Sequence, residues 1–301
     1  MCIRDSFLTS SSIAKFIVSE SKITKNDLVN ENGTGIGVLV PLLCKYAKHV
    51  ITTEIDKKLY DDAIRNFSKL PNLTINKGDG FKNEPEFDIF VSNLPYSESK
   101  NAIQWMLMEK FQHGIVMVQY DFAKKLLAEG NERKAISVLA QSGFEMKILK
   151  KIGKENFTPK PKIDSAIMSF SRKNTFSKEL IQSVNLMFSF RRKKLQNIGK
   201  KLGLEIKSDQ RLEEMNNNEI IKFAKKIKDL VNGSCELGQT GSGIMNFTNI
   251  LELGYSASQI QHLLDLDRIP DCMSEVVLIM ENLRKFLIQY FSGISYLGPL
   301  R

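Results

Sequence analysis

The 301-residue sequence predicts an α/β fold, in which a doubly wound, mostly parallel sheet of seven strands is followed by a small C-terminal helical domain. Short β-rich runs alternate with helical patterns from residue 27 to about residue 172, as expected for strands connected by helices. Residues 178–231 then show only helical periodicity, with a heavily basic face. The length and the 42% hydrophobic content provide ample material for a buried core.

The elements follow in order along the chain. The first is a short amphipathic helix over Ser10–Ser21, whose serines can cap it. The strands are predicted at Asp27–Glu31, His49–Glu54, Asn72–Asn76, Phe87–Ser92, Gly114–Gln119, Glu145–Ile152 and Ser165–Ser171. Helical patterns between the first five strands and after the fifth cover Val38–Lys48, Lys57–Lys69, Ser99–Lys110 and Asp121–Ala128. The last two strands form a β-hairpin that closes the sheet.

The chain divides by composition into four parts. Residues 7–174 form the predicted sheet domain, and residues 175–231 form the small helical domain. A linker rich in Gly and Ser is predicted at 232–243. Residues 244–301 show helical patterns but no catalytic motif, so we assign them no role.

The charge is unevenly distributed. The whole chain carries +9, with 43 Lys and Arg against 34 Asp and Glu. Residues 235–301 contain four basic and seven acidic residues, a net charge of −3, so residues 1–234 carry +12. Excess Lys and Arg attracts phosphates and therefore favours a polyanionic partner, although a merely soluble basic protein would carry the same charge.

Cysteine usage and hydropathy exclude several classes of protein. The four cysteines, Cys2, Cys44, Cys235 and Cys272, are widely spaced, which predicts neither a zinc site nor a disulfide framework. A reducing cytoplasm fits this pattern. The most apolar late stretch is interrupted by charges, and the first residues lack the apolar core of a signal peptide, so we expect no membrane segment.

A glycine-rich loop follows the first predicted strand. Gly33, Gly35 and Gly37 stand in Glu-Asn-Gly-Thr-Gly-Ile-Gly, from Glu31. Glycines let the backbone turn sharply and approach a ligand, and the next helix offers free N–H groups. The dinucleotide fingerprint G-x-G-x-x-G requires glycine at position 38, where this chain has Val38. The spacing therefore fits the nucleoside-binding loop of methyltransferases better than a nicotinamide site.

Carboxylates stand at the ends of the next two strands. Glu54 closes the second strand about 20 residues after the loop, where an acid can accept hydrogen bonds from both ribose hydroxyls. Asp56 is the alternative, although it can equally cap the following helix. After the third strand, Asp79 is placed to accept a hydrogen bond from an adenine amino group. Ordinary loop roles explain each acid alone, but three strand ends in order favour a nucleoside site.

The most specific motif is Asn93-Leu94-Pro95-Tyr96, after the fourth strand. An exocyclic amine of a base is a poor nucleophile, because its lone pair is delocalised into the ring. The Asn93 side-chain oxygen and the Leu94 carbonyl are two acceptors that can favour the nucleophilic geometry as charge develops. Pro95 stiffens the turn, and Tyr96 offers a flat face for an unstacked base. The turn therefore predicts methylation of a base amine.

With these motifs in place, the chain resembles the ribosomal RNA adenine dimethyltransferases, the KsgA-type enzymes, which are related to the Erm-type ribosomal methyltransferases. The likeness covers about Phe7 to Leu230 and includes Met117–Leu126, Ala135–Gln141, Phe157–Ser165 and Phe190–Leu195. It implies a Rossmann-like, seven-stranded class I methyltransferase sheet. It also implies S-adenosylmethionine as the cofactor and two methyl groups placed on adenine N6 in small-subunit ribosomal RNA during ribosome assembly.

Roles follow position by position from the resemblance. The target base would be held by Asn93, Leu94, Pro95 and Tyr96, with Phe157 stacking on its opposite face. The cofactor would be bound by Leu8, Glu31, Gly33, Gly35, Gly37, Glu54, Ile55, Asp79, Gly80 and Asn93. The basic run Arg191, Arg192, Lys193 and Lys194 would contact RNA phosphates, although a solvated helix face is the ordinary explanation of such a run.

The resemblance further implies a cytoplasmic monomer that acts on immature small ribosomal subunits. Two other functions remain open. One is an Erm-type enzyme for large-subunit ribosomal RNA, or a DNA adenine methyltransferase. The other is a non-catalytic RNA- or DNA-binding factor for assembly or transcription on the same scaffold, which the unusual Asp5-Ser6 before Phe7-Leu8 keeps open.

Overall fold

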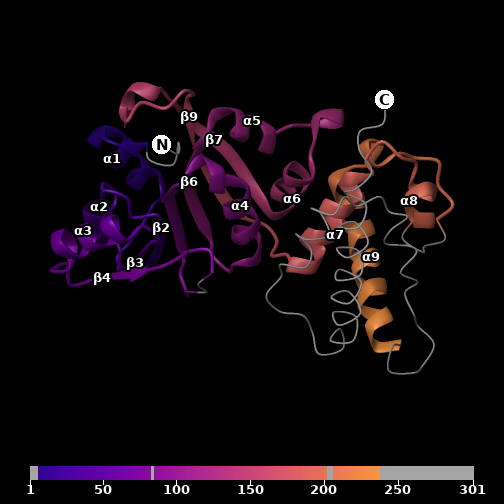
Figure 1. The fold of residues 1–301 in the computed structure, drawn as a ribbon, viewed down its shortest axis with the longest axis horizontal. Coiled ribbons are helices and arrows are strands. Elements are labelled where there is room, and N and C mark those ends of the chain that lie inside the picture. The colour runs from indigo at the N-terminus through magenta and orange to yellow at the C-terminus, as the bar shows by residue number, and fades with distance from the viewer. Residues whose placement is uncertain (1–5, 83–84, 202–205, 238–301) are drawn as a thin grey trace, which may run out of the picture. The chain divides into compact units, whose positions relative to one another are not determined.

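A seven-stranded sheet forms the centre of the computed structural model, which describes residues 6–82, 85–201 and 206–237 (Figure 1). The strand order is β4-β3-β2-β5-β6-β9-β7, and the first five of these strands are parallel, whereas β9 pairs antiparallel with β6 and β7. The bounds are β2 (Leu28–Asn32), β3 (His49–Glu54), β4 (Leu73–Lys77), β5 (Ile89–Asn93), β6 (His113–Gln119), β7 (Phe144–Ile152) and β9 (Ser165–Arg172). The predicted sheet and its closing hairpin are confirmed, with strand ends shifted by at most two residues.

Helices cover both faces of the sheet, as the doubly wound fold requires. Figure 1 shows α1 to α3 on one side of the strands and α4 and α6 on the other. The five predicted helices are present as α1 (Ser11–Glu20), α2 (Val40–Tyr46), α3 (Lys57–Phe67), α4 (Ser99–Met108) and α5 (Tyr120–Leu126). The structure adds α6 (Ala135–Gly143), which is buried along most of its length and therefore lacks the polar face that reveals a helix in a sequence.

Each face of the sheet has its own hydrophobic core. Helices α1 and α2 pack on Val50, Val91 and Ile115, which project from one face. Helices α4 and α6 pack on the other face, where Phe90 and Met168 are completely buried. Since strand side chains alternate between faces, adjacent residues of one strand enter different cores. The two cores hold the strand ends, and the loops that follow them, in fixed positions.

An aromatic cluster fixes the region around the fourth strand of the parallel set. The ring of Phe87 stacks on that of Trp105 at 5.7 Å, and Phe90 of β5 lies 5.2 Å from the same indole. Full burial of one such side chain stabilises the fold by about 1.5–3 kcal/mol. The cluster joins β5 to α4, which lie immediately before and after the Asn93–Tyr96 turn.

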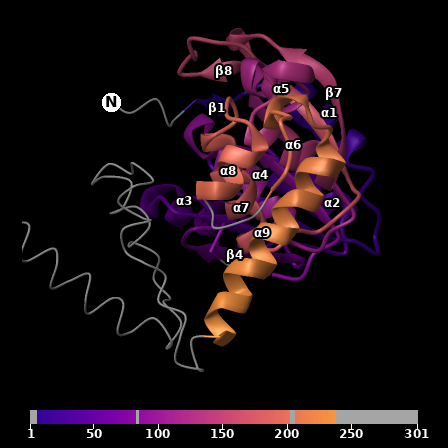
Figure 2. The ribbon, with the colours of Figure 1, turned by 90° about the vertical axis from the view of Figure 1, so that its right-hand side faces the viewer.

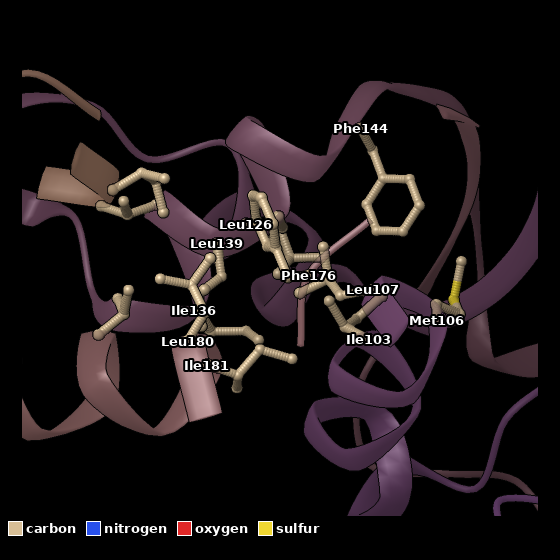
Figure 3. Close-up of a cluster of buried hydrophobic side chains, with 14 of the residues drawn as sticks. Ile103, Met106, Leu107, Leu126, Ile136, Leu139, Phe144, Phe176, Leu180 and Ile181 are labelled. Atoms are coloured by element: carbon tan, nitrogen blue, oxygen red, sulfur yellow. The ribbon is translucent and has the colours of Figure 1, made fainter. Parts of the chain in front are cut away.

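The C-terminal helices share a core with the sheet. Helices α7 (Lys178–Ser189), α8 (Leu195–Lys201) and the first turns of α9 (Asn217–Leu237) contribute to the same hydrophobic cluster as α4 and α6. Figure 3 shows Leu107 of α4, Leu139 of α6 and Leu180 of α7 converging in this cluster, and Figure 2 views the helical face directly. The described residues up to Lys228 therefore form one compact unit, and the division at 174/175 remains a prediction.

The predicted linker starts too early. Helix α9 continues to Leu237, through residues 232–237, because a single Gly233 costs a helix only about 1 kcal/mol and does not by itself end it. Residues 238–243 and the helical segment predicted at 244–301 lie outside the described residues. In the described part of the chain, no helix combines the length and the apolar character needed to cross a membrane.

Candidate active site

A pocket of about 800 Å³ opens at the carboxyl ends of β2, β3 and β5. In parallel α/β sheets this edge is where ligands bind, because the loops that leave neighbouring strands diverge there. The sequence-predicted residues that line the pocket are Leu8, Glu31, Gly33, Gly35, Glu54, Ile55, Asn93, Leu94, Pro95, Tyr96 and Phe157. Three motifs that are far apart in the sequence therefore meet in one hollow.

The glycine loop forms one wall of the pocket. Gly33, Gly35 and Gly37 have φ angles of 87°, 56° and 78°, a region that favours glycine over any other residue. Gly33 N donates a hydrogen bond to the Thr53 carbonyl at 2.8 Å, which anchors the loop to β3. Apart from Gly33 itself and its two chain neighbours, no residue has an atom within 4 Å of the position that a Cβ would take at Gly33, so there is open space there.

Gly37 is not among the residues that line the pocket. A Cβ at Gly37 would lie 2.1 Å from a ring atom of Phe67, the last residue of α3. The third glycine of the motif thus permits close packing of the loop on α3. Its predicted role as a direct cofactor contact stays a prediction.

Glu54 ties the loop to the end of β3. One carboxylate oxygen accepts a hydrogen bond from Gly35 N at 2.8 Å, and the other accepts from Asp56 N at 2.9 Å. Each oxygen can accept a second hydrogen bond, so Glu54 keeps acceptor capacity for a ligand. The neighbouring Ile55 is 70% exposed and gives the pocket an apolar wall. Asp56 caps α3 by accepting from Leu59 N, as the alternative for this residue predicted.

Glu31 lines the pocket and is almost completely buried. The Thr52 hydroxyl donates to its carboxylate at 2.7 Å, and Thr52 Oγ1 lies 2.7 Å from the Thr34 hydroxyl. Burial raises the pKa of Glu31 to about 8; the bond from Thr52 opposes this rise, and the negative charge of Glu54 adds to it. The carboxyl is therefore largely protonated at pH 7.

The Asn93–Tyr96 turn also lines the pocket. Asn93 is the last residue of β5, and Leu94 N donates to the Met117 carbonyl of β6 at 3.2 Å. Tyr96 begins a short 3₁₀ turn, and its phenol oxygen lies 2.7 Å from the Ser165 hydroxyl. Burial, the largest cause, raises the pKa of Tyr96. The turn is thus held at both ends by the neighbouring strands.

Phe157 reaches the pocket from a small second sheet. Strands β1 (Phe7–Leu8) and β8 (Phe157–Thr158) pair antiparallel, with Leu8 opposite Phe157. Thr9 N also donates to the Asn156 carbonyl at 3.0 Å. This two-stranded sheet was not predicted, because two-residue strands carry no periodic signal. It places Leu8 and Phe157 together at the pocket.

Two further predicted cofactor residues, besides Gly37, do not line the pocket. The Asp79 carboxylate accepts a hydrogen bond from Phe81 N at 3.0 Å and so stabilises the turn after β4. Gly80 packs against Asn32, since a Cβ there would lie 2.3 Å from the Asn32 side-chain oxygen. The structure therefore gives both residues a local packing role, and their contact with a cofactor stays a prediction.

The predicted RNA-contacting residues Arg191, Arg192, Lys193 and Lys194 lie together in the turns after α7. The first three of them line a second hollow of about 330 Å³ with Phe188, Ser189 and Phe190. Arg192 and Lys193 are exposed, whereas Lys194 forms an ion pair with Asp209 at 3.2 Å. The structure brings these residues together in a surface turn, apart from the residues that line the large pocket.

Some residues that line the pocket were missed by sequence reasoning. Lys58 and Asp62 of α3 line it, as do Ser6, Phe7 and Thr34. Lys58 and Asp62 are four residues apart and therefore lie on one face of a helix. This spacing could have indicated that both face the same surface. Phe7 was included in the stretch that resembles the family and Ser6 was noted as unusual, but neither was predicted as a site residue. Of the N-terminal residues that the structure describes, Ser6 and Phe7 thus reach the pocket wall.

Comparison with known proteins finds relatives that share one kind of name. The family described as "Ribosomal RNA adenine dimethylase" matches residues 3–234. The ribosomal RNA small subunit methyltransferase A of Thermotoga petrophila is 33% identical over 232 residues, which cover 73% of this chain and 88% of that protein. The probable ribosomal RNA small subunit methyltransferase A of Methanosarcina barkeri is 36% identical over 199 residues, 64% of this chain and 69% of that protein.

Solved structures share the fold. A dimethyladenosine transferase from Plasmodium falciparum superposes with a TM-score of 0.63 at 22% identity, covering 74% of this chain and 98% of that one. The 23S rRNA methyltransferase ErmE gives a TM-score of 0.55 at 20% identity, covering 73% and 99%. At these identities the likeness shows the fold alone, and it confirms the predicted Rossmann-like methyltransferase sheet.

Proposed function

The chain belongs to the ribosomal RNA adenine dimethylase family, and from that premise we propose that it transfers methyl groups from S-adenosylmethionine to adenine N6 in small-subunit ribosomal RNA. One observation carries the proposal. The glycine loop, Glu54 and the Asn93–Tyr96 turn line the same pocket, which supports a cofactor site and a base site that would be contiguous. Methyl transfer requires this contiguity, because the reacting atoms must be brought into line.

The residues present fit the cofactor. A pocket of about 800 Å³ is of the size that holds a nucleoside with an amino-acid arm. The open space beside Gly33 admits the amino-acid arm of the cofactor. Glu54 retains acceptor capacity for the ribose hydroxyls, and Ile55 offers an apolar surface for the adenine of the cofactor. When bound, the cofactor supplies an electrophilic methyl group on a sulfonium.

The chain's own residues would prepare the amine. The Asn93 side-chain oxygen and the Leu94 carbonyl accept hydrogen bonds from the adenine amino group, which favours a nucleophilic nitrogen as positive charge develops. Tyr96 and Phe157 stack on the extruded base and keep it out of the RNA helix. No dedicated general base is needed, because the amine loses its proton readily once it is alkylated. Orientation of the two reactants then supplies most of the acceleration.

The basic turn supports RNA as the substrate. We place Arg191 to Lys194 against phosphates of folded RNA, where such contacts position the substrate without reading its sequence. The substrate would be the immature small ribosomal subunit, and the enzyme would act as a monomer in the cytoplasm. The Erm-type alternative has less support, because the relatives above are small-subunit methyltransferases, whereas the likeness to ErmE shows the fold alone.

The test is methyl transfer from labelled S-adenosylmethionine to immature small subunits that lack this modification. Wild-type protein should label the subunits, and mass spectrometry should place the label on adenine N6. Asn93→Ala should lose labelling by a factor of about 100 or more. Asn66→Ala, an exposed change on α3, is the matched control and should label normally. Undiminished labelling by Asn93→Ala would defeat the assigned role of the turn.

Two parallel assays separate the alternatives. Naked large-subunit RNA should stay unlabelled, whereas an Erm-type enzyme would label it in preference to the small subunit. Calorimetric titration with S-adenosylmethionine should show stoichiometric binding. A factor that has lost catalysis would give no label, and it need not bind the cofactor.

A further inference from the structure

Ser165 occupies one of the most firmly held positions near the pocket. It is the first residue of β9 and is completely buried, and it pairs with Gln119 of β6 on one side and Ile152 of β7 on the other. Tyr120 N also donates to the carbonyl of the preceding Asp164 at 3.0 Å. Because Ser165 is paired with strands on both sides, the position of its hydroxyl is rigid.

Tyr96, in contrast, stands on a short turn at the pocket wall. The Ser99 hydroxyl donates to its carbonyl at 3.0 Å, which holds the backbone of the turn. The ring is half-buried and has two rotatable side-chain bonds, so backbone contacts alone do not determine its plane. The distal end of the ring is held by the 2.7 Å contact between its hydroxyl and that of Ser165, a residue 69 positions later in the chain.

We propose that Ser165 is a positioning residue for methyl transfer, and that it holds the Tyr96 ring in the plane on which the target adenine stacks. The inference rests on the proposed function, which gives Tyr96 its contact with the base. With the ring anchored at its backbone and at its hydroxyl, the stacking surface exists before RNA binds. The base then meets a preorganised face, and less side-chain freedom is lost on binding.

A purely structural bond between the two hydroxyls would behave differently. It would stabilise the fold, and its loss would reduce the fraction of folded enzyme and hence the apparent kcat, with KM unchanged. A positioning bond acts on the bound base in both ground state and transition state, so its loss raises KM for RNA and leaves kcat nearly constant. The split between KM and kcat therefore distinguishes the two roles.

The experiment measures methyl transfer to immature small subunits by Ser165→Ala, Tyr96→Phe and the double variant of the full chain. Each single change removes the hydrogen bond and keeps the ring of residue 96. We expect each to raise KM for the subunits by about two- to tenfold, with kcat within about twofold and an unchanged dissociation constant for S-adenosylmethionine. Both changes remove the same hydrogen bond. The KM of the double variant should therefore be no higher than that of the single variant with the higher KM.

Two controls complete the design. Ser169→Ala changes a serine on the same strand and should leave KM unaltered. Tyr96→Ala removes the ring and should abolish most activity. If Tyr96→Ala is impaired while Ser165→Ala and Tyr96→Phe keep the wild-type KM, the positioning role is wrong and the proposed function stands. Additive effects in the double variant would also overturn it, and no methyl transfer by the wild-type chain would overturn both.

Discussion

The Thr52 hydroxyl donates a hydrogen bond of 2.7 Å to a carboxyl oxygen of the buried Glu31. The Thr52 hydroxyl also lies 2.7 Å from the Thr34 hydroxyl, a contact in which either oxygen can be the donor. A chain of hydroxyls thus runs from the glycine loop to Glu31. It connects the loop backbone to the one pocket acid whose pKa is raised to about 8.

The raised pKa of Glu31 predicts a pH-dependent stability. Between about pH 4.5 and pH 8 the folded protein retains a proton on Glu31 that the unfolded chain has lost, so this contribution to the free energy of unfolding falls as pH rises. The fall is at most about 1.4 kcal/mol per pH unit. Glu31→Gln should remove it. Urea unfolding at pH 5.5 and 7.5 should show wild type losing about 2 kcal/mol more than the variant. Equal losses would contradict the buried, protonated acid.

The same group predicts pH-dependent cofactor binding. S-adenosylmethionine carries a sulfonium and an ammonium, and a positive charge near Glu31 favours its ionised form. Binding should therefore release a proton and strengthen as pH rises from 6 to 8, by up to about tenfold per pH unit. Calorimetry in buffers of different ionisation enthalpy counts that proton. Glu31→Gln should abolish the release, whereas the exposed Glu129→Gln should not. A proton count of zero for wild type would rule out this coupling.

Substitution by alanine in the glycine loop should lower the free energy of unfolding by different amounts at Gly33 and Gly37. Gly33 and Gly37 both have positive φ, which costs alanine about 1–2 kcal/mol. At Gly33 the new methyl meets open space, but at Gly37 it would lie 2.1 Å from the Phe67 ring, and such overpacking adds about 1–3 kcal/mol. Gly37→Ala should thus lower the free energy of unfolding by clearly more than Gly33→Ala. The matched pair is compared by chemical denaturation, and equal losses would contradict the packing role of Gly37.

The fold was predictable because its strands are apolar runs bounded by Gly, Asn and Asp, and the site was predictable because parallel strands end at one edge of the sheet. Glu54 and the Asn93–Tyr96 turn line the pocket for that reason. Helix α6 was missed because burial on most sides leaves no polar face. The Tyr96–Ser165 contact was missed because a local motif carries no information about a partner 69 residues away.

The glycines of a motif do not show by themselves which group they contact. A positive φ at Gly37 and the close packing at Gly80 both agree with a ligand-binding loop, yet their nearest neighbours are Phe67 and Asn32. A sequence indicates that a side chain is absent at such a position, but not whether a ligand or another residue occupies the space. Only the packed structure distinguishes the two.

The last prediction concerns the basic turn after α7. Arg192 is exposed, and its carbonyl accepts from the Arg211 side chain at 3.0 Å, a contact that a change of the Arg192 side chain leaves intact. If this guanidinium contacts one RNA phosphate, Arg192→Gln should weaken RNA binding about three- to tenfold at 0.1 M salt and should reduce the log–log salt slope by about 0.7–0.9. Lys48→Gln removes the same charge at the amino end of β3, opposite the pocket edge, and should change neither quantity. Filter binding from 0.05 to about 0.3 M salt measures both. Equal weakening by the two variants would mean that RNA senses the net charge of the protein and not a contact at this turn.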